Sequence, residues 1–193
     1  MSKRIALLTA AAFGALALTA VIVAPVSAQD KMTKSEMSGE KTVMVGGAAM
    51  FPSKNIIQNA VNSKDHTTLV AAVKAAGLVT TLEGRGPFTV FAPTNAAFAK
   101  LPAGTVDTLV KPENKATLTK ILTYHVVAGK LEASDLTDGK KLKTVQGEEL
   151  TVKRSGDTVM IIDSKGGSSS VTIPNVNQSN GVIHVVDTVL MPS

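Results

Sequence analysis

The chain has 193 residues, a formal net charge of +5, and 3% aromatic residues, without cysteine or tryptophan. This length suggests one domain, at most with an extension. The lack of cysteine excludes disulfide scaffolds, cysteine-ligated zinc, iron–sulfur clusters, thiol nucleophiles and a lipid on an N-terminal cysteine, and the few aromatic residues argue against base-stacking nucleic-acid platforms.

Residues 1–28 have the order of a secretory signal peptide. Two basic residues precede an uncharged run over residues 5–23, and Val26 and Ala28 fit the small-residue positions of a cleavage site. We therefore expect cleavage after Ala28 and a secreted protein, either extracellular or periplasmic. The alternative is an uncleaved membrane anchor, which Pro25 disfavours. Cleavage would lower the net charge to +3, which does not indicate nucleic-acid binding.

Residues 29–52 mix charged, hydroxyl and glycine residues without a sustained period, which predicts a flexible leader. Four of the seven methionines fall here: Met32, Met37, Met44 and Met50. Thioethers bind Cu(I), so a copper- or small-ligand-binding protein that uses this leader is the alternative function. Irregular spacing and the absence of a neighbouring histidine favour methionine as a tolerated apolar residue.

The first half of the remaining chain has a helical pattern. Asp65 can cap a helix over residues 66–76, which Gly77 stops. A second helix is expected over residues 113–124. Its apolar stripe, spaced i, i+3, i+4 and i+7, consists of Leu118, Ile121, Leu122 and His125.

Between these helices, residues 88–91 predict a short strand. Thr94 or Asn95 then caps a brief helix that carries Phe98. A further short helix is expected near residues 105–110.

After Gly129 the period changes to that of strands. Residues 150–152 and 158–162 predict a hairpin around a turn at 155–157. A second turn is expected over 166–170, before a strand with Val171 and Ile173. Residues 182–190 predict a long closing strand.

Helices that precede strands predict an α+β fold with a mainly antiparallel sheet, in one domain over residues 53–193. The lack of strand–helix alternation excludes a doubly wound nucleotide fold.

Catalytic and metal-binding motifs are absent from the sequence. His66, His125 and His184 each stand alone, without the paired spacing of a local metal site. No G-x-S-x-G elbow or phosphate-binding loop occurs. We therefore expect neither an enzyme nor a cofactor, and we expect the histidines to be hydrogen-bonded core or surface residues.

Basic residues cluster in the second half of the chain, where they could form a patch if their two strands are neighbours. Such a patch would attract acidic polysaccharide or lipid headgroups. A solvated hairpin balanced by Glu148 and Glu149 is the favoured alternative. The patch residues would be Lys140, Lys141, Lys143, Lys153 and Arg154.

Three segments, in this order and spacing, resemble the fasciclin-like domain family over residues 53–192. They are Gly86–Phe98, the Tyr124–Gly129 segment with its tyrosine–histidine pair, and Ser179–Pro192. The resemblance implies a wedge or small β-sandwich with several short helices packed alongside. The layout of signal, leader and one domain looks like that of bacterial secreted members.

The resemblance also implies a non-enzymatic module for cell adhesion or for contact with a cell surface or extracellular matrix. Its partner would be a protein or polysaccharide, with no nucleic acid and no stable membrane insertion after signal removal. In animal relatives, integrin-binding surface is attributed to the segment that maps to Tyr124 and His125. Physical reasoning favours a mainly structural role, because both side chains can anchor the helix end to the sheet through hydrogen bonds.

Overall fold

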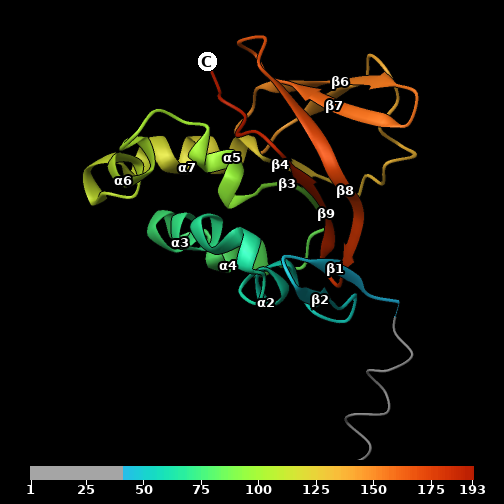
Figure 1. The fold of residues 1–193 in the computed structure, drawn as a ribbon, viewed down its shortest axis with the longest axis horizontal. Helices are drawn as coiled ribbons and strands as arrows, with labels where there is room; N and C mark the ends of the chain where they lie inside the picture. The colour runs from blue at the N-terminus through green and yellow to red at the C-terminus, as the bar shows by residue number, and fades with distance from the viewer. Residues whose placement is uncertain (1–40) are drawn as a thin grey trace, which may run out of the picture. The chain divides into compact units, whose positions relative to one another are not determined.

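Two layers, one of helices and one of strands, make up residues 41–193, the part of the chain that the computed structural model describes (Figure 1). The predicted signal peptide, its cleavage site after Ala28 and residues 29–40 of the predicted leader lie outside the described residues. The helices are α2 (Ile56–Ala60), η1 (Lys64–His66), α3 (Thr67–Ala76), α4 (Val79–Glu83), α5 (Asn95–Ala99), α6 (Thr105–Leu109), η2 (Pro112–Asn114) and α7 (Lys115–Tyr124). The strands are β1 (Val43–Val45), β2 (Ala48–Met50), β3 (Phe88–Pro93), β4 (Val126–Ala128), β5 (Lys141–Lys143), β6 (Glu149–Ser155), β7 (Thr158–Ile162), β8 (Ser168–Gln178) and β9 (Gly181–Val186).

Seven strands form one mixed sheet in the order β4-β3-β9-β8-β7-β6-β5. Only β3 and β9 pair in parallel, and the other neighbours are antiparallel. The two ends of the sheet approach each other through a bridge between Val127 and Thr144, so the sheet nearly closes into a barrel. The α+β prediction and the mainly antiparallel sheet are confirmed.

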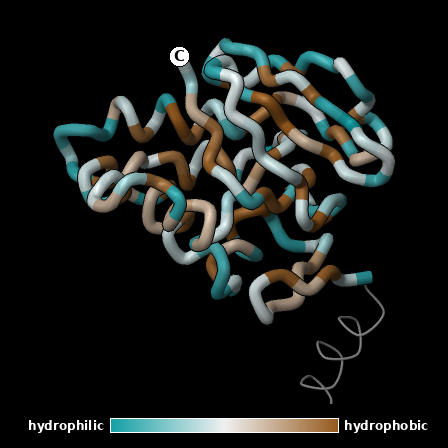
Figure 2. The backbone as a smooth tube through the Cα atoms, turned by 45° about the horizontal axis from the view of Figure 1, so that its top comes forward, coloured by the Kyte–Doolittle hydropathy of each residue, from teal (hydrophilic) through white to brown (hydrophobic). Residues whose placement is uncertain are grey.

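Strand β9, which lies between β3 and β8, is buried along its whole length because it is covered on both faces. Ile183 and Val185 pack against the helices, whereas His184 and Val186 point into the barrel, where the His184 ring stacks on Phe91 with ring centres 5.7 Å apart. Apolar segments of the tube accordingly run through the middle of the molecule, and polar ones form its outer turns (Figure 2). Two apolar cores result, one under the helices and one inside the barrel.

The two ends of α3 differ in how well the sequence predicted them. Gly77 ends α3 in the left-handed conformation with φ +74°, as predicted. The other end differs, because residues 64–66 form a 3-10 turn and α3 begins at Thr67. Its cap comes from another element: Asn95 Oδ1 accepts hydrogen bonds from the Thr68 N–H at 3.0 Å and from the Thr67 hydroxyl at 3.2 Å.

The short helix α5 is capped as predicted, since the Thr94 hydroxyl oxygen accepts a hydrogen bond from the Ala97 N–H at 3.2 Å. Within residues 41–193, none of the helices has the length and apolar character needed to cross a bilayer.

The strands confirm the predicted hairpin and correct two boundaries. β6 and β7 pair from Thr151–Ile162 to Ser155–Thr158, around a two-residue turn. The predicted turn over 166–170 is shorter, because β8 already begins at Ser168. The closing strand ends at Val186 rather than at residue 190, because Asp187 turns its carboxylate back to accept a hydrogen bond from the Ser170 N–H at 2.9 Å.

The structure also differs from the predicted flexible leader, because its end folds as the β1–β2 hairpin. Val45 and Met50 are each 3% exposed and belong to the core under the helices. Asn59 clamps the chain after the hairpin, accepting from the Phe51 N–H at 3.0 Å and donating to the Phe51 carbonyl at 2.8 Å. Tertiary contacts therefore order a segment that lacks a periodic pattern of its own.

Candidate functional site

The corner where α7 runs into β4 carries Tyr124 and His125, the pair highlighted by the sequence. α7 buries Leu118, Ile121 and Leu122, which confirms the predicted apolar stripe. His125 ends the helix with φ −82° and ψ −3°, and the chain enters β4 at the next residue. Both side chains are thereby directed into the molecule.

Tyr124 links α7 to the far side of the barrel. Its side chain is fully buried in the barrel core. Its hydroxyl oxygen accepts a hydrogen bond from the Ser164 N–H at 2.9 Å and lies 3.5 Å from the Glu149 carbonyl, to which the hydroxyl can donate. A buried tyrosine hydroxyl needs such partners, so this side chain ties the helix to the loops around β6 and β7.

His125 links the end of α7 to the C-terminal segment. Its Nδ1 lies 2.8 Å from the Ile121 carbonyl oxygen, and its Nε2 lies 3.0 Å from the Leu190 backbone nitrogen. A carbonyl only accepts and an N–H only donates, so these partners require a neutral ring with its proton on Nδ1. Burial lowers the pKa of His125 to about 4, against the opposing effects of the Ile121 carbonyl and the Asp163 charge.

The Tyr124–His125 pair therefore has an internal role. Tyr124 is 0% exposed and His125 is 2% exposed, and their polar atoms are engaged by backbone groups. A direct contact with a partner would need accessible atoms that neither side chain offers. Their burial supports the structural interpretation, and a contact of this segment with a partner stays a prediction.

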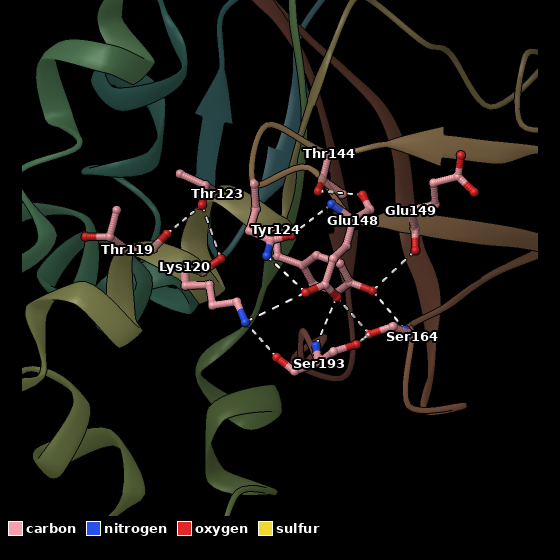
Figure 3. Close-up of polar contacts among 10 residues, drawn as sticks. Thr119, Lys120, Thr123, Tyr124, Thr144, Glu148, Glu149, Ser164 and Ser193 are labelled. Carbon is pink, nitrogen blue, oxygen red and sulfur yellow. Dashed lines mark hydrogen bonds and ion pairs between the residues drawn. The ribbon is translucent and has the colours of Figure 1, made fainter.

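A polar cluster over this corner joins segments far apart in the sequence (Figure 3). The Glu148 carboxylate accepts hydrogen bonds from the Ser193 N–H at 2.9 Å, the Ser164 hydroxyl at 3.0 Å and the Gln146 amide at 3.0 Å. Lys120 on α7 lies 3.7 Å from the same carboxylate and donates to the Ser193 carbonyl at 2.6 Å. Sequence reasoning missed this cluster, because its members are up to 73 residues apart and share no motif.

The electrostatics of Glu148 suit a structural role. The hydrogen bond from the Ser193 N–H, followed by those from Gln146 and Ser164, lowers the pKa of Glu148 to about 2, although desolvation opposes the shift. The carboxylate is therefore ionised at neutral pH, and internal donors occupy both of its oxygens. Such a group holds the C-terminal segment in place and is poorly suited to general-base catalysis.

The strands that carry the predicted basic patch are neighbours, as that prediction required. β5 pairs with β6, and Lys141 lies opposite Thr151. Strand alternation places Lys141, Lys143 and Lys153 on the exposed outer face, while Leu142 points into the barrel. We call Lys141, Lys143 and Lys153 the lysine row.

The side chains of the other two patch residues, Lys140 and Arg154, bind backbone carbonyls. Lys140 donates to the Asp135 carbonyl at 2.7 Å, and Arg154 donates to the Gly156 carbonyl at 3.1 Å. The predicted balance by acidic residues holds for Glu149, which pairs with Lys141 at 3.3 Å. It does not hold for Glu148, whose carboxylate belongs to the polar cluster.

The two remaining histidines are also buried. His184 Nε2 lies 2.8 Å from the Leu131 carbonyl oxygen, and His66 Nδ1 lies 2.9 Å from the Ser63 hydroxyl. Burial lowers the pKa of both rings. Residues 41–193 contain no group of three or more histidines, aspartates or glutamates that could hold a metal ion.

The methionines of the predicted leader do not form a common site in the described part of the chain. Met44 is 60% exposed, whereas Met50 is 3% exposed and packs in the core. Met32 and Met37 lie outside the described residues. The thioether of Met50 is therefore not available to an external ion.

The core under the helices encloses a cavity of about 40 Å³. Aliphatic side chains dominate its wall, together with the rings of Phe91, His66 and His125. No serine, aspartate, glutamate or lysine lines it. This cavity has the chemistry of a packing void and lacks the converging polar groups of a catalytic pocket.

The fold matches a solved structure of a FAS1 domain pair from the insect cell adhesion molecule fasciclin I. The TM-score is 0.65 at 19% identity, over 73% of this chain and 52% of that chain. At this identity the match shows the fold alone, and it corresponds to about half of the larger chain.

Sequence comparisons identify closer relatives. Protein sll1483 of Synechocystis sp. is 48% identical over 153 residues, which cover 79% of this chain and 82% of that protein. Immunogenic protein MPB70 of Mycobacterium bovis is 41% identical over 69% of this chain and 66% of its own length. Cell surface glycolipoprotein MPB83 of the same species is 40% identical over 77% of this chain and 64% of its own length. The family model described as Fasciclin domain matches residues 64–192, and the chain therefore belongs to the fasciclin domain family.

Proposed function

We propose that the protein is an exported, non-catalytic module that attaches to a partner on a cell surface or in an extracellular matrix. The names of two family members support this proposal, since one is a cell surface glycolipoprotein and the other a cell adhesion molecule. The order of basic, apolar and small residues over 1–28 supports export, with cleavage after Ala28.

One observation carries the proposal: the polar groups that could serve catalysis are engaged inside the fold, whereas charged groups face solvent. The Tyr124 hydroxyl, both ring nitrogens of His125 and the Glu148 carboxylate bind internal partners. The lysine row is exposed on the outer face of β5 and β6. Lys141 is paired with Glu149, whereas Lys143 and Lys153 have no acidic partner within residues 41–193. Such exposed positive charge favours encounter with an oppositely charged surface.

Binding of the exported protein to cell envelopes of its own host tests the proposal. N-terminal sequencing of the exported form should begin at Gln29, and the protein should show saturable retention on envelopes. The variant with Lys143→Glu and Lys153→Glu should be retained several-fold less, because two exposed charges are reversed.

The matched control reverses two exposed lysines of the helical layer, with Lys74→Glu and Lys111→Glu. Equal retention of both double variants would refute a role for the lysine row. A lack of saturable retention for the unmodified protein would refute attachment itself.

A further inference from the structure

A groove lies between β4 and β5, where the barrel is incompletely closed. The two strands meet at the Val127–Thr144 bridge, next to which the Val145 N–H donates to the Val126 carbonyl at 2.8 Å. Within the described residues, the two strands share no other pairing. Past the bridge they diverge and leave a groove of about 420 Å³.

The wall of the groove combines aliphatic surface with positive charge. Ala128 and Leu131 contribute accessible apolar surface, above the buried side chains of Val127 and Leu142. The other lining residues are Thr144 and three lysines, Lys140, Lys141 and Lys143. No carboxylate lines the groove. Its electrostatic complement is therefore a negatively charged ligand with an apolar side.

The backbone of β5 is also available to a ligand. The Val152 N–H donates to the Lys140 carbonyl at 2.8 Å, and the Thr144 N–H donates to the Glu148 carbonyl at 3.0 Å. In an antiparallel pair these bonds recur at every second residue. The backbone groups of Lys141 and Lys143 therefore point away from β6. Those of Lys141 face the groove, whereas the Lys143 carbonyl faces the Ala128 N–H across the Val127–Thr144 bridge.

The charges decide what can pair with this edge. Lysines on an edge strand prevent pairing with a second copy of the same chain, because like charges would be brought together. Lys141 is paired with Glu149 at 3.3 Å on the outer face, whereas Lys143 forms no ion pair or side-chain hydrogen bond within residues 41–193. The edge thus disfavours basic strands and complements acidic ones.

We propose that the groove binds an extended acidic peptide segment, which adds a strand along the β5 edge. Its backbone pairs with Lys141, its alternate carboxylates approach the ammonium groups of Lys141 and Lys143, and the intervening apolar side chains pack on Leu131 and Ala128. This inference rests on the proposed function and names the chemical class of its partner. A peptide is favoured over an acidic polysaccharide because the groove offers a strand edge and aliphatic walls, and no aromatic ring lines it.

Fluorescence anisotropy with the full exported protein tests the inference, using a labelled peptide that alternates glutamate and valine over eight residues. We expect saturable binding that weakens as salt rises from low to physiological ionic strength. Lys143→Glu should weaken binding about fivefold or more, while the control Lys74→Glu should leave it unchanged.

A second peptide separates strand addition from charge attraction alone. N-methylation of alternate residues on the pairing edge keeps every charge and removes the N–H donors, so it should weaken binding about tenfold. Equal affinity of the methylated peptide would overturn strand addition. Absence of saturable peptide binding would overturn the inference, and so would Lys143-dependent binding of polygalacturonate without peptide binding. If the peptide test fails but the protein is still retained on cell envelopes, the inference is wrong and the proposed function holds. Failure of the inference and failure of the proposed function are therefore distinguishable.

Discussion

The buried ring of His125 predicts a specific loss of stability in mild acid. Its pKa is about 4 in the folded protein and close to the ordinary value of 6.5 in the unfolded chain. Between pH 6.5 and pH 4, His125 is largely protonated in the unfolded chain but largely neutral in the folded protein. The stabilising effect of the neutral ring is thus complete above pH 6.5 and is lost as pH falls toward 4.

The magnitude follows from the two pKa values. Each pKa unit corresponds to about 1.4 kcal/mol, so the full difference is worth about 3 kcal/mol below pH 4. At pH 5, where the folded ring is still largely neutral, about 2 kcal/mol of the free energy of unfolding is lost through this one residue.

Urea unfolding at pH 7.5 and pH 5.0, followed by circular dichroism, measures this loss for the wild type and for His125→Gln. Gln lacks a titrating group, so the fall in unfolding free energy between the two pH values should be about 2 kcal/mol smaller in the variant. The comparison of two pH values cancels the constant cost of the substitution. His66 and His184 contribute equally to both proteins and cancel as well.

Ile121→Val serves as the control, since it lowers stability by about 1 kcal/mol without changing a titrating group. It should lose as much stability in acid as the wild type. If His125→Gln also shows the full wild-type loss, the neutral buried ring is not the origin of the acid sensitivity and the reasoning is refuted.

Three further substitutions test the contacts that hold the fold, each by urea unfolding at pH 7.5. Tyr124→Phe removes the acceptor of the Ser164 N–H and should cost about 1 kcal/mol, and an unchanged midpoint would show that the hydroxyl is dispensable. Asn95→Ala removes the acceptor that caps the Thr68 N–H and should cost about 1 kcal/mol. Unchanged stability would show that α3 does not depend on this cap. Gly181→Ala adds a Cβ that collides with the β3 backbone and should destabilise by several kcal/mol, whereas wild-type stability would mean that the parallel pair can separate freely.

The sequence signals that predicted structure correctly are local ones. Gly77 stops α3 and Thr94 caps α5 because these effects act within one helical turn. The stripe of α7 depends only on the spacing of its apolar residues. The β6–β7 hairpin was predicted because its strands are separated by a short turn and alternate in polarity.

The incorrect boundaries have distant causes. α3 begins after the predicted cap because Asn95, 27 residues away, supplies the acceptor at its N-terminus. The end of the predicted flexible leader is instead folded as strands β1 and β2, because Val45 and Met50 pack into an apolar core formed by helices that come later in the chain. A local pattern carries no information about partners at such separations.

For the site, the sequence by itself determined the family segments, the lack of thiol chemistry and the positions of Tyr124, His125 and the lysines. Only the tertiary structure decided that Tyr124 and His125 are buried and that the five-residue basic patch separates into an outer row and two backbone-bound side chains. The physical reason is that exposure and pairing depend on which strands and loops the chain brings together. Residue type and spacing determine what a side chain can bond, and the path of the chain determines whether its partner is internal or remains available to another molecule.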